Sequence, residues 1–422
     1  MATTFTLVTV PAVLMIFFFS NTPPHPVLAS KGHLERCPPY ELLRPCCYCN
    51  SIPKYFGSGG DDGDDDDERE CSSSQAVVHN SARCQAPVIT CIGGGGGGDH
   101  LEEDLGNAIG RTFSRVTAHT VNPLLRRFEW LYLVDDHIKV LPAEALAGGL
   151  HFRHVYIKAA PSLLVINETA FGGLQNTYTQ SLFINATALA DVPRLRRATF
   201  RAVGAMRALE VLEFQATNFT VVPFKAFNGP GGGRLKVVRF YNPDRRGGLT
   251  TIGTRAFHRA HALEEIDLKN NRISVIKAYA FAFQRPANRT LALSVYLSGN
   301  RLHSDSFALG ALLGGNGRNV TLYLGGYDGG CNRALATLRR EVFEPFLEES
   351  PGNIVDMYGC PLLCDHRMEW LTFRLERYRA QVRNLECYVH SAGAKDSSLD
   401  DSMFSSSAAV RVISKDNYYH VD

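Results

Sequence analysis

Residues 262–281 read ALEEIDLKNNRISVIKAYAF. The aliphatic side chains of Ile266 and Leu268 flank Asp267, and this alternation is typical of a strand with one buried and one open face. Asn271 follows three residues after Leu268, where an inward-facing amide can satisfy backbone groups at a turn. The stretch therefore predicts a short strand, a turn and a looser apolar return segment.

The same unit recurs along the chain. If the second inward apolar residue of each strand is taken as a marker, successive markers lie 24 to 33 residues apart. The markers are Leu133, Ile157, Ile184, Phe214, Phe240, Leu268, Leu297, Leu324 and Met357. The residue two positions before each marker is always Leu, Val or Ile. This pattern predicts an α/β solenoid, namely a leucine-rich-repeat horseshoe with a parallel concave sheet and cysteine-rich terminal caps.

Composition divides the chain into five expected parts. Residues 1–29 have the features of a signal peptide, because the apolar run 7–19 is followed by small residues before a cleavage point at Ala29. An uncleaved anchor is the alternative, although the run is shorter than the roughly 17–25 residues that span a bilayer. We expect an amino-terminal cysteine-rich cap at 37–91 with an acidic disordered insert, about nine repeats at 113–358, a carboxy-terminal cap at 359–390 and a disordered tail at 391–422.

Cysteines and sequons favour an exported, glycosylated protein. The chain has 11 cysteines, clustered towards its ends. Seven of them lie in 37–91, an odd number, so at least one thiol there is free or pairs elsewhere. We expect disulfides in this cap to involve Cys37, Cys47, Cys49 and Cys71, with the pairing open. Five Asn-x-Thr sequons predict glycosylation at Asn167, Asn185, Asn218, Asn288 and Asn319.

Several segments also allow a more specific chemical interpretation as metal or nucleotide sites. Cys47 and Cys49 could bind zinc, and the acidic run 57–70 could bind calcium, but it lacks the spacing of a hand-type loop. The glycine run 93–98 matches a dinucleotide fingerprint only trivially; we expect no strand before it and no helix soon after it, and so interpret it as a flexible link. His258 and His261 have metal-ligand spacing, although exposed histidines beside Arg259 are the simpler interpretation.

Neither the composition of the chain nor any motif in its sequence predicts an enzyme. The net charge is +2, so no global field favours nucleic acid or an acidic partner. The metalloprotease, serine-hydrolase and P-loop motifs are absent from the sequence. We therefore expect no catalytic residues, no cofactor, no metal and no membrane span, and a partner that is an extracellular protein.

The open face of the predicted sheet carries the candidate site. Five of the eight residues that stand between the inward pairs of the first eight units are aromatic. With neighbours on the same face, the expected protein-binding residues are Trp130, Tyr132, His154, Tyr156, Phe183, Arg239, Tyr241, Asp267, Tyr296 and Tyr323. The alternative is that these rings simply pack on one another across neighbouring repeat units, which we call rungs. Glycans at Asn185 and Asn319 would obstruct parts of the face and divide it into two patches.

The caps carry a family resemblance. Residues 359–390 resemble a carboxy-terminal leucine-rich-repeat cap, and this implies a Cys364–Cys387 disulfide with Trp370 over the last repeat. Cys360 stands at the ladder position of its unit, as a buried thiol or a partner of Cys331. Together with CPPYELLRPCCYC and GCPLLCDHRMEWL, the repeats over 37–390 resemble arthropod secreted leucine-rich-repeat proteins named after the non-catalytic subunit of oplophorus-luciferin 2-monooxygenase. The resemblance implies a non-enzymatic companion role; glycan or microbial-pattern recognition through the aromatic face is a third interpretation.

Overall fold

The computed structural model describes residues 37–44, 46–52, 86–92, 105–134, 138–158, 160–172, 175–185, 188–189, 191–242, 248–284, 291–326, 330–388 and 410–412. All of them belong to one compact unit, Cys37–Asp422. The expected signal peptide, the acidic insert, Cys71 and Asn288 lie outside the described residues.

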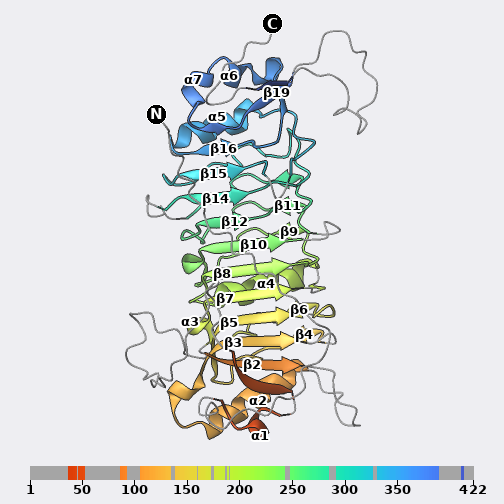
Figure 1. Cartoon of the computed structure of the whole chain (residues 1–422), viewed down its shortest axis with the longest axis vertical. Coiled ribbons are helices and arrows are strands. Elements are labelled where there is room, and N and C mark those ends of the chain that lie inside the picture. The colour runs from red at the N-terminus through yellow and green to blue at the C-terminus, as the bar shows by residue number, and fades with distance from the viewer. Residues whose placement is uncertain are drawn as a thin grey trace, which may run out of the picture. The chain divides into compact units, whose positions relative to one another are not determined.

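The core of the fold is a 12-stranded sheet in which every neighbouring pair is parallel except the first (Figure 1). This confirms a large, mostly parallel sheet with few helices among the described residues, a solenoid-like α/β arrangement. In sheet order the strands are β1 (Cys47–Ile52), β2 (Ala86–Ile92), β3 (Arg127–Val134), β5 (His151–Lys158), β7 (Ser181–Asn185), β8 (Val211–Gln215), β10 (Val237–Tyr241), β12 (Glu265–Asp267), β14 (Leu293–Tyr296), β15 (Val320–Tyr323), β16 (Ile354–Asp356) and β18 (Val382–Arg383).

The register of this sheet aligns one column of inward aliphatic residues from β3 to β16. Each member pairs directly with the corresponding residue of the next strand, and none is more than 1% exposed. The column is Leu131, Val155, Leu182, Leu212, Val238, Ile266, Val295, Leu322 and Val355. A one-residue slip in any strand would expose its aliphatic side chains, so burial fixes the register.

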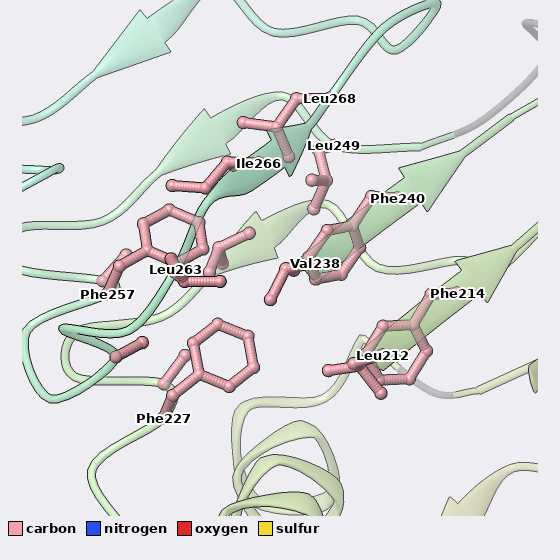
Figure 2. Packing of buried hydrophobic residues seen from close by; sticks show 14 of the residues in the cluster. Leu212, Phe214, Phe227, Val238, Phe240, Leu249, Phe257, Leu263, Ile266 and Leu268 are labelled. Atoms are coloured by element: carbon pink, nitrogen blue, oxygen red, sulfur yellow. The ribbon is translucent and has the colours of Figure 1, made fainter. Parts of the chain in front are cut away.

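Short parallel strands form a second layer. β4 (Val140–Leu141) pairs with β6 (Val165–Ile166), whereas β9 (Val221–Val222), β11 (Thr251–Ile252) and β13 (Val275–Ile276) form a three-stranded sheet. Phenylalanines that follow these strands point into the core between the layers (Figure 2). Phe227 and Phe257 stack with ring centroids 5.6 Å apart, and Phe257 and Phe281 stack at 5.9 Å.

Helices occur at the ends and at a few joints. They are α1 (Tyr40–Leu43), α2 (Leu105–His119), η2 (Pro123–Arg126), α3 (Gln175–Tyr178), α4 (Pro193–Ala205), η3 (Gly232–Arg234), α5 (Arg340–Glu349), η4 (His366–Met368), α6 (Glu369–Thr372) and α7 (Leu375–Tyr378). Within the described ranges, no helix has both the length and the apolar character required to cross a bilayer.

Two expectations about the region around the glycine run 93–98 are wrong. β2 immediately precedes the run, and α2 follows it. Ile109, Phe113 and Val116 lie on one side of α2 at helical spacing and are at most 1% exposed, so burial of this stripe stabilises the helix despite its glycines. The run itself lies outside the described residues.

The amino-terminal cap adds strands to the sheet and is cross-linked. Disulfides join Cys37 to Cys49 and Cys47 to Cys91, and the second bond links the antiparallel strands β1 and β2. Cys46 has a free thiol. Burial raises the pKa of this thiol, against the effect of the nearby Thr112 hydroxyl, so the thiolate is disfavoured at neutral pH.

The carboxy-terminal cap takes part in the other two disulfides of the described residues. Cys364 pairs with Cys387, as the cap resemblance implies, and Cys331 pairs with Cys360. Trp370 is 8% exposed and donates a hydrogen bond to the carbonyl oxygen of Leu338 (3.1 Å). β17 (Leu362–Leu363), β19 (Glu386–Tyr388) and β20 (Val410–Val412) form a small sheet. β20 is the part of the expected tail 391–422 that the structure describes.

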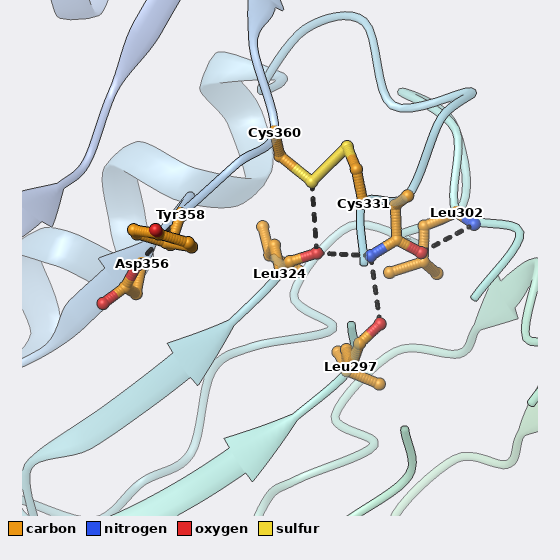
Figure 3. Close-up of a disulfide and its surroundings, with 8 residues drawn as sticks. Leu297, Leu302, Leu324, Cys331, Asp356, Tyr358 and Cys360 are labelled. Carbon is orange, nitrogen blue, oxygen red and sulfur yellow. Dashed lines mark hydrogen bonds between the residues drawn. A yellow bond between two sulfur atoms is a disulfide. The ribbon is translucent and has the colours of Figure 1, made fainter. Parts of the chain in front are cut away.

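A ladder of buried asparagines runs beside the ends of the later strands. Asn271 donates to the carbonyl of Phe240 in the preceding rung, and Asn300 donates to that of Leu268. Asn332 continues the ladder, donating to Leu297 at 3.0 Å and to Leu324 at 2.6 Å while accepting from the amide of Leu302 at 3.3 Å (Figure 3). Each amide therefore joins two rungs where sheet pairing ends.

Candidate binding face

The predicted residues between the inward pairs form one continuous row on the open face of the long sheet. Each pairs in register with the next, and all of them are half-buried. The row runs Tyr132, Tyr156, Phe183, Glu213, Arg239, Asp267, Tyr296 and Tyr323. Since parallel strands lie about 4.8 Å apart, neighbouring side chains of the row are within contact distance.

Strands β3, β5 and β7 bring five rings together as an aromatic cluster: Trp130, Tyr132, His154, Tyr156 and Phe183. Trp130 lies at the centre, with ring centroids 4.5 Å from His154, 5.6 Å from Tyr132 and 6.1 Å from Phe183. Tyr156 contacts Tyr132 at 5.8 Å and Phe183 at 5.9 Å. Trp130 stacks on Tyr132 and Phe183, whereas Tyr156 meets Tyr132 at a tilt and Phe183 edge-on, so packing partly covers the ring faces.

Polar groups fix the orientation of this cluster. His154 Nε2 lies 3.4 Å from a carboxylate oxygen of Glu129, a residue that sequence reasoning did not single out. Asn185 Nδ2 donates to the hydroxyl oxygen of Tyr156 at 3.1 Å. Burial raises the pKa of Tyr132, and the adjacent Tyr156 raises it further, so the Tyr132 phenol remains a neutral hydrogen-bonding group at physiological pH.

The middle of the row is an ion-pair network. Arg239 Nε donates to Glu265 at 2.7 Å, and its Nη1 lies 3.6 Å from Glu213. Lys269 Nζ lies 3.3 Å from Asp267. Burial raises the pKa of the Asp267 carboxyl above its usual range, although Lys269 acts in the opposite direction. The alternation of charges in neighbouring strands neutralises most of the local field while leaving directed hydrogen-bonding groups on the face.

A pair of tyrosines follows the ion-pair network. The rings of Tyr296 and Tyr323 are nearly parallel, with centroids 4.5 Å apart. Lys269 Nζ lies 5.2 Å from the centroid of Tyr296, and therefore links this pair to Asp267. Burial raises the pKa of Tyr296, and Tyr323 contributes to the rise. Tyr241, at the end of β10, is 46% exposed and has a more open position than the rest.

The described sequons differ in their accessibility. Asn218 and Asn319 are exposed, whereas Asn167 and Asn185 are half-buried. Asn167 accepts hydrogen bonds from the backbone amide and the hydroxyl of Thr169, at 3.0 and 3.1 Å, which leaves its Nδ2 uninvolved in that turn. A glycan on Asn185 would be attached to the Nδ2 that contacts Tyr156, and would therefore lie directly beside the aromatic cluster.

The described residues contain no group of three His, Cys, Asp or Glu side chains arranged to hold a metal ion. His258 and His261 fall in the segment that follows β11, and His261 Nδ1 lies 3.0 Å from the carbonyl oxygen of Arg259. Cys47 and Cys49, the alternative zinc ligands, are both in disulfides. In comparisons with known proteins, no family model and no curated sequence matches this chain.

Proposed function

We propose that this chain is an exported, glycosylated leucine-rich-repeat protein, with about nine repeats between cysteine-rich caps, that binds another protein through the open face of its long sheet. The in-register aliphatic column and the asparagine ladder support the repeat architecture. The four disulfides of the described residues support an oxidising, extracellular environment.

The observation that carries the binding function is the aromatic cluster. Trp130, Tyr132 and Tyr156 are half-buried, preorganised by mutual packing and anchored on the two adjacent strands β3 and β5. Tyr and Trp dominate binding free energy in protein interfaces because they present large apolar area at low entropic cost. The neighbouring ion-pair network supplies directed polar contacts, which set the register of a partner.

Ring geometry favours a protein over a carbohydrate on this face. Sugars stack on flat aromatic faces, but Tyr296 and Tyr323 cover each other, and Lys269 lies over Tyr296. Trp130 likewise stacks on Tyr132 and Phe183. Exposed ring edges and phenol hydroxyls suit a protein surface with complementary apolar and polar groups.

The test compares two double variants against a partner captured from extracellular fluid and then purified. Tyr132→Ala/Tyr156→Ala removes two rings from the cluster, while Phe224→Ala/Tyr279→Ala removes two exposed rings, 59% and 44% accessible, from the short-strand side. Loss of hot-spot aromatics predicts a Kd at least about 30-fold weaker for the first variant, and no more than about a twofold change for the second. Equal affinities for a folded first variant would refute the proposal.

The same capture separates a free recognition protein from a non-catalytic enzyme subunit. A subunit would be recovered in a fixed molar ratio with one enzyme chain, whereas a recognition protein would exchange with its partner on dilution. In both cases the open face would bind the partner, and the molar ratio of the two recovered chains distinguishes the two cases.

A further inference from the structure

The segments that contain the three short strands β9, β11 and β13 have an unusual charge distribution. Residues 220–234, 248–262 and 272–284, which we call the basic return strip, contain six Lys or Arg residues and two His residues but no Asp or Glu. The described acidic residues of the same rungs, such as Glu213 and Glu265, belong instead to the long sheet. Each rung is therefore electrically mixed on the open face and purely basic on the strip.

Parallel pairing places these cations side by side. Val221 pairs with Thr251, which pairs with Val275, so Lys225 and Arg255 occupy equivalent positions on neighbouring rungs. Arg255 donates its backbone amide to the carbonyl of Tyr279, which is the equivalent residue of the third rung (3.1 Å). At the spacing of parallel strands, about 4.8 Å, these three positions form a track across the rungs, with two cations followed by a tyrosine.

Four cations of the strip lack acidic partners in the described part of the chain. None of the ion pairs found there includes Lys225, Arg255, Arg259 or Lys277. Burial lowers the pKa of His258, and the charges of Lys225, Arg255 and Arg259 lower it further. The potential at this surface is therefore positive although the whole chain is nearly neutral.

A cavity of about 160 Å³ opens next to the track. It is lined by Gly229, Pro230, Gly233, Arg259, His261 and Gln284. One end of the Arg259 guanidinium is fixed by a 2.9 Å hydrogen bond to the carbonyl of Asn228, and its remaining N–H groups stay available. Because His261 Nδ1 donates to the Arg259 carbonyl, its Nε2 is the nitrogen free to meet a ligand.

Exposed rings stand between the cations. Phe224 is 59% exposed with Lys225 Nζ 5.1 Å from its ring centroid, and Tyr279 is 44% exposed with the Arg255 guanidinium at 5.9 Å. In contrast to the rings of the open face, these two are not stacked on other aromatic side chains among the described residues. Alternating cations and accessible rings match the sulfate groups and the apolar faces of a sulfated sugar chain.

We propose that the basic return strip is a binding site for a sulfated polysaccharide, with one sulfate group held in the cavity beside Arg259 and His261 and the chain running across Lys225 and Arg255. The site is separate from the open face, so a protein partner and an acidic polysaccharide can be held at the same time. Such a ligand would retain an exported protein in a sulfated extracellular matrix.

The experiment measures binding of a fluorescent, fully sulfated heparin oligosaccharide to the intact chain at increasing salt. The strip variant is Lys225→Gln/Arg255→Gln/Arg259→Gln. The control variant, Arg301→Gln/Arg333→Gln/Arg383→Gln, lowers the net charge equally at exposed arginines outside the strip. We expect at least about tenfold weaker binding (about 1.4 kcal/mol) for the strip variant and less than about twofold for the control.

A further variant and two other polyanions complete the test. The charge-retaining variant Lys225→Arg/Arg255→Lys/Arg259→Lys should bind the oligosaccharide at least about threefold more tightly than the strip variant, because it keeps all three positive charges although Lys and Arg differ in hydrogen-bonding geometry. No binding by the wild type, or equal loss in the strip and control variants, would overturn the proposal. Equally tight binding of polyglutamate or single-stranded DNA would overturn the assignment to a sulfated polysaccharide.

Discussion

Asn332 offers the sharpest test of what holds the later rungs together. Its side chain is 0% exposed, and it serves three backbone groups, the carbonyls of Leu297 and Leu324 and the amide of Leu302. Asn332→Ala leaves all three without this partner. The Leu297 carbonyl also accepts from Asn300, so two groups are left unsatisfied. An unsatisfied buried polar group costs about 1–3 kcal/mol, so the loss should reach about 2 kcal/mol even at the lower end.

The assay is urea denaturation followed by tryptophan fluorescence. The chain has two tryptophans, so Trp130→Phe leaves Trp370 as a reporter beside the last rungs. With a slope of about 1–3 kcal/mol/M, the midpoint should fall by about 0.7–2 M in the Asn332→Ala background. The matched control is Asn228→Ala, which changes an exposed asparagine. A shift no larger than that of the control would refute the idea that the ladder stabilises these rungs.

Two further predictions concern buried charge. Arg318 is 1% exposed and donates to the carbonyls of His261, Leu263, Leu291 and Ala292, and burial lowers its pKa to about 10. Arg318→Met should therefore cost about 3–5 kcal/mol in urea unfolding, and wild-type stability of this variant would contradict the assignment. For Asp267, the folded pKa is raised above the unfolded value of about 3.9, so the folded state binds the proton more readily and stability falls as pH rises from about 4 through the folded pKa. Asp267→Asn should flatten this dependence, and a wild type that gains stability over the variant with rising pH would show that the sign is wrong.

The sequence predicts the long sheet well because each strand carries its own signal. Apolar residues two positions apart, such as Leu131 and Leu133, can be buried on only one face, and this determines which side chains of β3 face solvent. The position of Tyr132 and Tyr156 follows from the same alternation. Their mutual contact follows from parallel pairing, which needs no information beyond the repeat itself.

The sequence does not reveal features that depend on tertiary contacts. Gly106 and Gly110 weaken the local preference for the helix α2, and only the burial of Ile109 and Phe113 stabilises it. Asn332 stands eight residues after Leu324 instead of three, because an insertion lengthens that turn, so the spacing rule misses it. Partners such as Glu129 for His154 come from neighbouring strands, and no local pattern marks them.

The basic return strip could be predicted from the sequence only in part. Ala226, Ala256 and Ala280 each follow their short strand at the same offset, and aligning them would have placed Lys225 and Arg255 on neighbouring rungs from sequence alone. The cavity beside Arg259 requires coordinates, because Gly229 and Gln284 come from different rungs.

Hydroxyl-radical footprinting of the wild-type chain with its purified partner shows whether the open face of the long sheet binds that partner, because this method reports the accessibility of aromatic side chains. We expect protection of Trp130, Tyr132 and Tyr156 on binding, with no change at the exposed Phe373 and Tyr279. Protection of Phe373 or Tyr279, with Trp130, Tyr132 and Tyr156 as reactive in the complex as in the free protein, would contradict this expectation.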